Sequence, residues 1–190
     1  MISADEALQK LIEGNERFVS GDLLHPNRCQ ERREELLDGQ TPFAAILGCS
    51  DSRSGAEIIF DQGLGDLFVV RVAGNILAEE VIGSLAYAVN ELDVNLIVVK
   101  GHDHCGAVTA ALKDDNDCVY IKTLLDRIKP LIADHNTPAD IEKITKRNVR
   151  NVVSQLKNMN LVFDNKLASG KLKIVGAYHD LASGKVEFSI

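Results

Sequence analysis

Short apolar runs rich in β-branched residues alternate along this chain with stretches in which apolar residues recur every three or four positions. The short runs have the length and composition of buried strands, and they occupy residues 43–47, 67–70, 96–99 and 174–177. The stretches with helical spacing occupy residues 7–12, 81–89, 124–132 and 139–159. Strands that alternate with helices predict an α/β fold with a mainly parallel β-sheet flanked by helices.

The two ends of the chain carry different patterns. Residues 185–190 alternate between polar and apolar side chains after a turn at 182–184, which predicts a half-exposed closing strand. Residues 3–38 are charged with scattered apolar positions, a pattern that fits either two helices lying on the domain or an arm packing on a partner subunit. No repeat or linker divides the 190 residues, so we expect a single domain over 1–190 that includes an N-terminal helical arm at 1–38.

Charge and hydropathy argue against two classes of partner. Asp and Glu number 28 against 21 Lys and Arg, and the resulting net charge of −7 repels phosphate backbones and anionic lipid surfaces. The N-terminus has no signal-peptide pattern, and no segment approaches the roughly 20 apolar residues of a membrane span. We therefore expect a cytoplasmic protein that binds neither nucleic acid nor membrane.

Three potential metal ligands follow the ends of two predicted strands. Cys49 comes directly after the first strand, and His102 and Cys105 follow the third. Loops at the carboxyl ends of parallel strands line one crevice, so the two sulfurs and the imidazole are expected to converge there. Two thiolates and one imidazole match a catalytic zinc site with three protein ligands and an open fourth position.

The same residues allow other interpretations. A closed structural zinc site would need a fourth ligand, for which the candidates are His104, Cys29 and Cys118, none at an obvious ligand spacing. Buried thiols without a metal are a further alternative. A phosphate-binding thiol loop is disfavoured, because Arg53 follows Cys49 too soon and no glycine run accompanies it.

Asp51 and Arg53 stand close together beside the predicted ligand Cys49. The planar guanidinium of Arg53 can hold the Asp51 carboxylate through two hydrogen bonds, and a carboxylate held in this way can accept a hydrogen bond from a metal-bound hydroxide. The alternative is a surface ion pair or a simple turn, since Ser-Asp-Ser sequences are common in turns.

Two motifs resemble the signature of the β-carbonic anhydrases. They are Cys-x-Asp-x-Arg at 49–53 and Gly-His-x-x-Cys-Gly at 101–106. The likeness extends through 60–75 and 83–89, and more weakly through 14–18. The resemblance implies a β-carbonic anhydrase-like fold and a zinc lyase that reversibly hydrates carbon dioxide to bicarbonate through a zinc-bound hydroxide.

The resemblance also implies a ligand set and a catalytic pair. It implies one Zn²⁺ per chain, held by Cys49, His102 and Cys105. It further implies that Asp51, paired with Arg53, orients the zinc-bound hydroxide toward carbon dioxide held in an apolar slot.

Other residues receive roles from the resemblance alone. Gln40 falls where the family carries a substrate-binding glutamine. Phe68 and Tyr87 fall where relatives line the substrate pocket, although core packing explains these two aromatic residues equally well. His104 stands near the metal loop, as either a proton shuttle or a packed side chain. The family forms dimers or larger assemblies, so a homodimer or homotetramer is implied.

The chain departs from the family's usual pattern at several positions. Ser54-Gly55 stands where Val-Pro is common, and Asp103 stands where Ser or Thr is usual. Because a few proteins of this fold hydrolyse carbonyl sulfide or carbon disulfide, these changes leave such a hydrolase as an alternative, beside a non-catalytic zinc-binding scaffold. Ile46 stands where some relatives carry a Trp that helps bicarbonate to close the site. We therefore expect an open site at neutral pH, with Asp51 held by Arg53.

Overall fold

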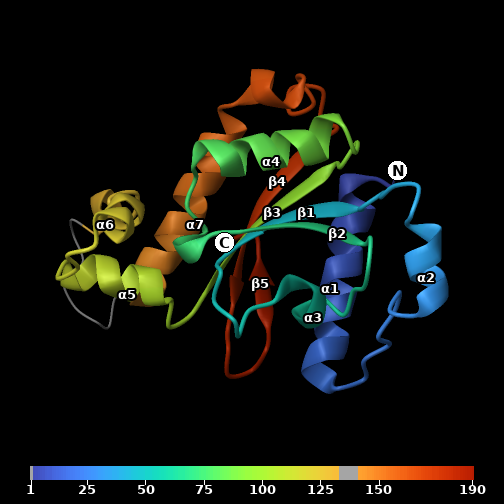
Figure 1. Ribbon diagram of the computed structural model, residues 1–190, viewed down its shortest axis with the longest axis horizontal. Helices are drawn as coiled ribbons and strands as arrows, with labels where there is room; N and C mark the ends of the chain where they lie inside the picture. The colour runs from blue at the N-terminus through green and yellow to red at the C-terminus, as the bar shows by residue number, and fades with distance from the viewer. Residues whose placement is uncertain (1, 133–140) are drawn as a thin grey trace.

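A computed structural model describes residues 2–132 and 141–190, and within them the chain forms a five-stranded sheet (Figure 1). Its parallel strands are β1 (Ala44–Gly48), β2 (Leu67–Arg71), β3 (Leu96–His102) and β4 (Lys173–His179). β5 (Val186–Phe188) runs antiparallel to β4 at one edge, and the strand order is β2-β1-β3-β4-β5. The predicted α/β class, the mainly parallel sheet and the closing strand are confirmed.

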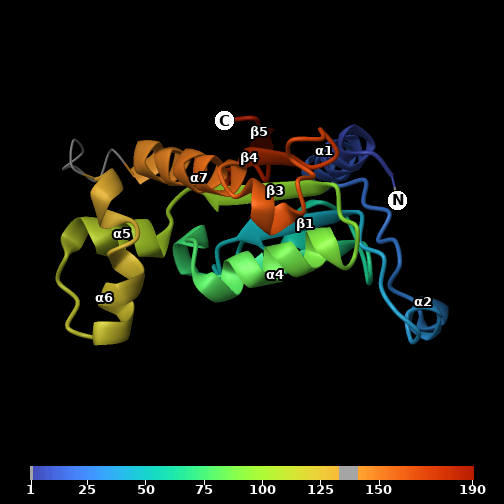
Figure 2. The same cartoon turned by 90° about the horizontal axis from the view of Figure 1, so that it is seen from above.

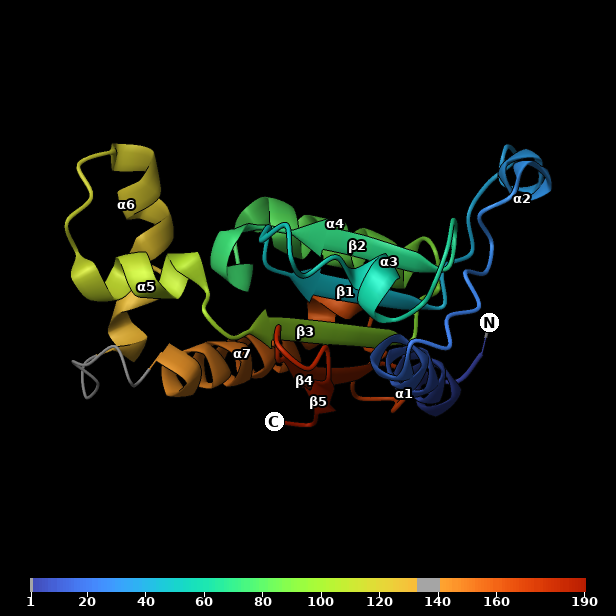
Figure 3. The same cartoon turned by 90° about the horizontal axis from the view of Figure 1, so that it is seen from below.

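Helices cover both faces of the sheet. α4 (Glu79–Asn90) and α7 (Ile141–Lys157) pack on one face, and α1 (Ala4–Ser20) and α3 (Ala56–Ile59) pack on the other. α5 (Gly106–Lys113) and α6 (Val119–Leu125) lie at one end of the molecule, and α2 (Gln30–Glu35) lies at the opposite end (Figure 2, Figure 3). None of the helices in the described part of the chain has the length and apolar character needed to span a bilayer.

The helix predicted over 124–132 is wrong in part. α6 ends at Leu125, and the chain continues through a turn into a 3-10 helix at Lys129–Leu131. Pro130 explains the break, because proline removes an amide donor and its ring clashes with the preceding turn of an α-helix. Ile128 is nevertheless fully buried, so the apolar spacing correctly marked a core-facing position.

The remaining helical predictions agree with the structure. The stretches 7–12 and 81–89 lie within α1 and α4. The helix predicted over 139–159 is present as α7, and residues 139 and 140 lie outside the described residues. Short 3-10 helices also occur at Ala73–Asn75 and Asn160–Phe163.

The N-terminal segment consists of a docked helix and a projecting one. α1 begins at a capping box between Ser3 and Glu6, and it buries Ala7 and Leu11 in the core on its face of the sheet. α2, in contrast, has no buried residue. The first helix therefore lies on the domain, and packing of the segment on a partner subunit stays a prediction.

Asp61 fixes the connection between α1 and α2. Its carboxylate accepts hydrogen bonds from Arg17 Nε at 2.7 Å and from the amides of Leu24 and His25 at 3.0 Å each. Burial alone would raise the pKa of Asp61, but these hydrogen bonds outweigh burial and hold the pKa below its ordinary value. The ionised carboxylate is therefore the form that ties this segment to the domain.

Two glycines let α7 approach the sheet beside the predicted ligands. A Cβ atom at Gly101 would lie 2.8 Å from Val149 Cγ2, and one at Gly176 would lie 2.9 Å from Val149 Cγ1. Because a valine side chain is stiff about χ1, neither Cβ would fit without a shift of the helix. α7 thus packs closely on β3 immediately before His102 and helps to fix the end of the strand that carries this residue.

Candidate metal centre

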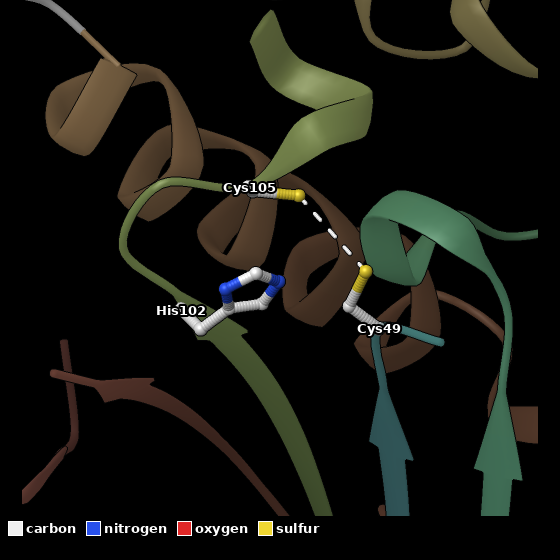
Figure 4. Close-up of side chains that lie close together, drawn as sticks. All are labelled: Cys49, His102 and Cys105. Carbon is white, nitrogen blue, oxygen red and sulfur yellow. Dashed lines mark hydrogen bonds between the residues drawn. The ribbon is translucent and has the colours of Figure 1, made fainter. Parts of the chain in front are cut away.

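Cys49, His102 and Cys105 come together where β1 and β3 end (Figure 4). Cys49 follows β1 directly, His102 is the last residue of β3, and Cys105 caps the N-terminus of α5. β1 and β3 are neighbours in the sheet, so their carboxyl ends open at the same place. The three candidate ligand atoms lie within 4.8 Å of one another, and all three residues are buried.

The geometry of the three donors fits zinc. The two sulfur atoms are 4.0 Å apart, and tetrahedral zinc with bonds of about 2.3 Å to sulfur places two sulfurs about 3.8 Å apart. His102 Nδ1 lies 2.7 Å from the carbonyl oxygen of Asp103, so Nδ1 carries the proton and donates it. The other ring nitrogen, His102 Nε2, is buried without a hydrogen-bond partner among the described residues. It therefore presents a free lone pair to the cluster, as a metal ligand requires.

A hydrogen bond between the two cysteine side chains shifts the pKa values of Cys49 and Cys105 in opposite directions. The hydrogen bond from the Cys105 thiol holds the pKa of Cys49 well below its ordinary value, and the same bond raises the pKa of Cys105. The amide of Gly74 also donates to Cys49 Sγ at 3.2 Å and stabilises its thiolate. The cluster is therefore anionic before a cation enters, which favours binding of a divalent metal.

Asp51 and Arg53 form a bidentate pair beside the cluster. Arg53 Nε donates to Asp51 Oδ1 at 2.9 Å, and a terminal guanidinium nitrogen donates to Oδ2 at 2.7 Å. These hydrogen bonds hold the pKa of Asp51 well below its usual range, so its carboxylate is ionised at neutral pH. Asp51 Oδ2 lies 3.9 Å from His102 Nε2, and Asp51 is not a member of the three-residue ligand group. The carboxylate thus lies beside the candidate ligand group and is held by Arg53, and its catalytic role stays a prediction.

Arg71, which was not predicted as a site residue, anchors the loop that carries Cys49 and Asp51. Its Nε donates to the carbonyl oxygen of Cys49 at 3.0 Å, and a terminal nitrogen donates to that of Asp51 at 2.6 Å. Arg71 is the last residue of β2, which is paired with β1. A charged residue at the carboxyl end of an apolar strand was the signal that could have identified it.

The structure does not bring the predicted substrate residues to the cluster within one chain. Gln40 is exposed and precedes β1, whereas Cys49 follows that strand, and five residues of strand span about 16 Å. Phe68 and Tyr87 lie together with ring centroids 6.2 Å apart, and Tyr87 is 51% exposed. Phe68 lies near the amino end of β2, whereas the carboxyl end of that strand, at Arg71, is the end close to the candidate metal ligands. Their substrate roles stay predictions.

His104 and Asp103 follow the ligand His102. The His104 side chain is 78% exposed, and its Nε2 lies 3.6 Å from Asp103 Oδ2. Asp103 Oδ1 accepts a hydrogen bond from the amide of Leu181 at 2.7 Å, which ties the metal loop to the segment after β4. His104 is therefore not packed away, and its role in proton transfer stays a prediction.

Cys29 and Cys118 stand apart from the metal cluster. Both thiols are exposed, and neither belongs to the ligand group found among the described residues. His104 is likewise not a member of that group. The part of the chain that the structure describes therefore offers three protein donors to one metal. This arrangement is typical of a catalytic zinc site and differs from a closed structural site, which has four.

Fold and site together define an α/β protein with a three-donor zinc site, and comparison with known proteins makes the family clear. A family model described as carbonic anhydrase matches residues 44–186. The chain is 44% identical to carbonic anhydrase 2 of Mycobacterium tuberculosis, over 94% of this chain and 89% of that protein. It is 42% identical to a carbonic anhydrase of Mycolicibacterium smegmatis, over 95% of this chain and 91% of that protein.

Solved structures show the same likeness. The fold is similar to a tetrameric β-carbonic anhydrase from Sordaria macrospora with a TM-score of 0.75 and 28% identity, over 82% of this chain and 84% of that chain. It is similar to the β-carbonic anhydrase CcaA with a TM-score of 0.71 and 29% identity, over 95% and 94% of the two chains. The chain belongs to the β-carbonic anhydrase family, whose members use zinc to hydrate carbon dioxide.

Proposed function

We propose that the chain reversibly hydrates carbon dioxide at a zinc ion held by Cys49, His102 and Cys105, with Asp51 and Arg53 as the catalytic pair. The observation that carries this assignment is the buried His102 Nε2, which has no hydrogen-bond partner among the described residues and lies next to two sulfurs. A bound metal ion would give this nitrogen the partner that it lacks. Three protein donors then leave one coordination position for a reactant.

A zinc ion held by these three residues would supply a nucleophile at neutral pH, since zinc lowers the pKa of a water molecule to about 7. The Asp51 carboxylate can only accept hydrogen bonds, and Arg53 fixes the direction of its lone pairs. Asp51 would therefore orient a reactant oxygen at this position by accepting a hydrogen bond from it. Ile76 and Val108 belong to the same apolar cluster as the two ligand cysteines, and these surroundings suit the nonpolar substrate carbon dioxide.

One experiment separates carbon dioxide hydration from the two alternatives. Stopped-flow hydration of carbon dioxide is measured on zinc-loaded protein, beside a carbonyl sulfide hydrolysis assay on the same sample. We expect rapid zinc-dependent hydration and little or no hydrolysis of carbonyl sulfide. Preferential hydrolysis of carbonyl sulfide would favour the hydrolase, and the absence of both activities would favour a non-catalytic zinc scaffold. The relatives named above are all carbonic anhydrases, which favours the first result.

We further propose a homodimer or homotetramer in which Gln40, Phe68 and Tyr87 serve the substrate pocket across a subunit interface. The half-exposed edge strand β2, the exposed Tyr87 and the projecting helix α2 support this proposal. The similar protein from Sordaria macrospora is described as tetrameric. Light scattering tests the assembly, and a species of 20.7 kDa at working concentration would contradict it.

A reducing compartment such as the cytoplasm is the location that we propose. Zinc binding by Cys49 and Cys105 requires reduced thiols, and their sulfurs are close enough for oxidation to compete with metal binding. All four cysteines are free thiols in the structure. Localisation of the tagged full chain by cell fractionation tests this proposal.

A further inference from the structure

A buried polar cluster lies beneath the Asp51–Arg53 pair and has no part in the mechanism above. It consists of Lys100 on β3, Ser54 after the catalytic pair and His179 at the end of β4. Lys100 is 0% exposed, Ser54 1% and His179 2%. A wholly buried lysine is rare in proteins, because removing an ammonium group from water is costly.

All three side chains converge on Ser54. Lys100 Nζ donates to the Ser54 carbonyl oxygen at 3.2 Å and also to Ser54 Oγ. Ser54 Oγ lies 3.0 Å from His179 Nδ1, so the serine hydroxyl can donate to that nitrogen while it accepts from the lysine. Ser54 is therefore held through its carbonyl oxygen and its side chain, by residues on two different strands.

Ser54 in turn closes the turn that presents Asp51 to the metal. The Ser54 amide donates to the Asp51 carbonyl oxygen at 3.1 Å, and the Arg53 amide donates to Asp51 Oδ1 at 3.0 Å. Arg71 fixes the beginning of this turn through the same Asp51 carbonyl. The cluster around Lys100 fixes its end. The turn is thus clamped on both sides of the catalytic carboxylate.

The sequence of the turn explains why such a clamp is needed. Glycine widens the range of accessible backbone conformations, and Gly55 directly follows Ser54. Its φ of −70° is close to the value of about −65° that proline imposes. A Cβ at this position would meet only Ile58 Cδ1, at 3.9 Å. The φ of Gly55 and the space around its Cα are therefore compatible with the φ and the Cβ of a proline, and this chain uses a flexible residue instead.

Burial of this polar cluster costs more free energy than burial of apolar side chains of the same volume would. His179 Nε2 is buried without a partner among the described residues, and Lys100 follows two apolar residues, Leu96 and Val98, on the same face of β3. Apolar residues of similar volume would pack there without desolvating an ammonium group. A role in holding the turn accounts for this cost, whereas packing alone does not.

We infer that Lys100 is a positioning residue that, through Ser54 and with His179, holds the Asp51 turn in its catalytic geometry in place of a rigid backbone at position 55. The inference rests on the proposed role of Asp51. It predicts that loss of the clamp loosens the turn without removing the metal ligands, and that stiffening Gly55 restores the turn.

The test compares Lys100→Met and Ser54→Ala in the full chain, with Lys171→Met as a control that removes an exposed lysine. We expect kcat for carbon dioxide hydration to fall at least fivefold in Lys100→Met and less in Ser54→Ala, with KM and zinc content within twofold of the parent. Hydrogen–deuterium exchange of the peptide covering residues 51–55 should become at least tenfold faster. Lys171→Met should change none of these quantities.

Gly55→Pro supplies the decisive second variant. It is combined with Lys100→Met, or with Ser54→Ala if the lysine variant does not fold. In that double variant, hydrogen–deuterium exchange at residues 51–55 should become slower, and at least half of the lost kcat should return. Unchanged exchange and kcat in both clamp variants would overturn the inference, as would failure of Gly55→Pro to restore either quantity. Because deuterium exchange needs no activity, it decides the inference even if the proposed role of Asp51 fails.

Discussion

Replacement of Asp51 by Asn tests the catalytic pair with the smallest possible change of shape. The carboxylate accepts three hydrogen bonds from Arg53: from the amide at 3.0 Å, from Nε at 2.9 Å and from a terminal nitrogen at 2.7 Å. An asparagine has only one oxygen acceptor. In place of Oδ2 it has an NH₂ group, which is a donor and cannot accept the hydrogen bond from the terminal guanidinium nitrogen of Arg53. A hydrogen bond to a charged group contributes about 1.5–3 kcal/mol, and loss of one leaves the side chain free to turn.

The expected result is a large loss of turnover with the metal retained. Residues that orient the groups around a metal typically cost about 10–100-fold in activity when they are replaced, and we expect kcat/KM of Asp51→Asn to fall within this range. Zinc content should stay at the parental value, because the ligand atoms belong to Cys49, His102 and Cys105. Stopped-flow kinetics and elemental analysis on the same sample give both quantities. Full activity in Asp51→Asn would refute the role assigned to this carboxylate, and zinc loss in proportion to activity would make it a ligand.

Three further predictions concern the metal, the docking of α1 and the response to acid. Cys105→Ser should lose zinc in elemental analysis while Cys118→Ser retains it, and equal loss in both would point to a structural site. Gly14→Ala places a Cβ 1.9 Å from the Phe60 carbonyl oxygen and should lower the free energy of unfolding by about 1–3 kcal/mol in urea, whereas Gly83→Ala meets no atom within 4 Å and should not destabilise. The pKa of Asp61 is lowered on folding, so its contribution to stability is full above its unfolded value of 3.8 and is lost as pH falls through the folded pKa. Urea titrations between pH 7 and 3 should show this decline, and Asp61→Asn, already less stable at pH 7, should show a shallower one; equal slopes would contradict the assignment.

The metal site could be predicted from the sequence because its residues follow strands. Cys49 and His102 stand directly after, or at the end of, apolar runs, and the carboxyl ends of parallel strands share one edge of a sheet. The adjacency of β1 and β3, which brings the ligands together, is set by tertiary packing and could not be derived from the local pattern. The same rule places Gln40 at the opposite edge, since it precedes β1. Resemblance to a family gave Gln40 a role in substrate binding. It did not indicate that Gln40 lies far from the candidate metal ligands of its own chain.

The buried cluster of Lys100, Ser54 and His179 could not be predicted from the pattern of apolar residues. The predicted third strand ended at residue 99, the last residue of the apolar run, because lysine side chains are seldom fully buried. β3 in fact continues to His102, and Lys100 is wholly buried where it meets Ser54. A charge that is paired through tertiary contacts has no local signature. Pro130, in contrast, is a local signal for the break after α6, and its effect on the backbone outweighs the helical spacing of the apolar residues around it.

A crystal structure of the zinc-loaded protein near pH 7.5, with anomalous data at the zinc edge, would show which atoms hold the metal. We expect zinc bound by Cys49 Sγ, Cys105 Sγ and His102 Nε2, a water or small anion as the fourth ligand, and Asp51 still held by Arg53. Direct coordination of zinc by an Asp51 oxygen, or by any fourth protein side chain, would contradict this expectation.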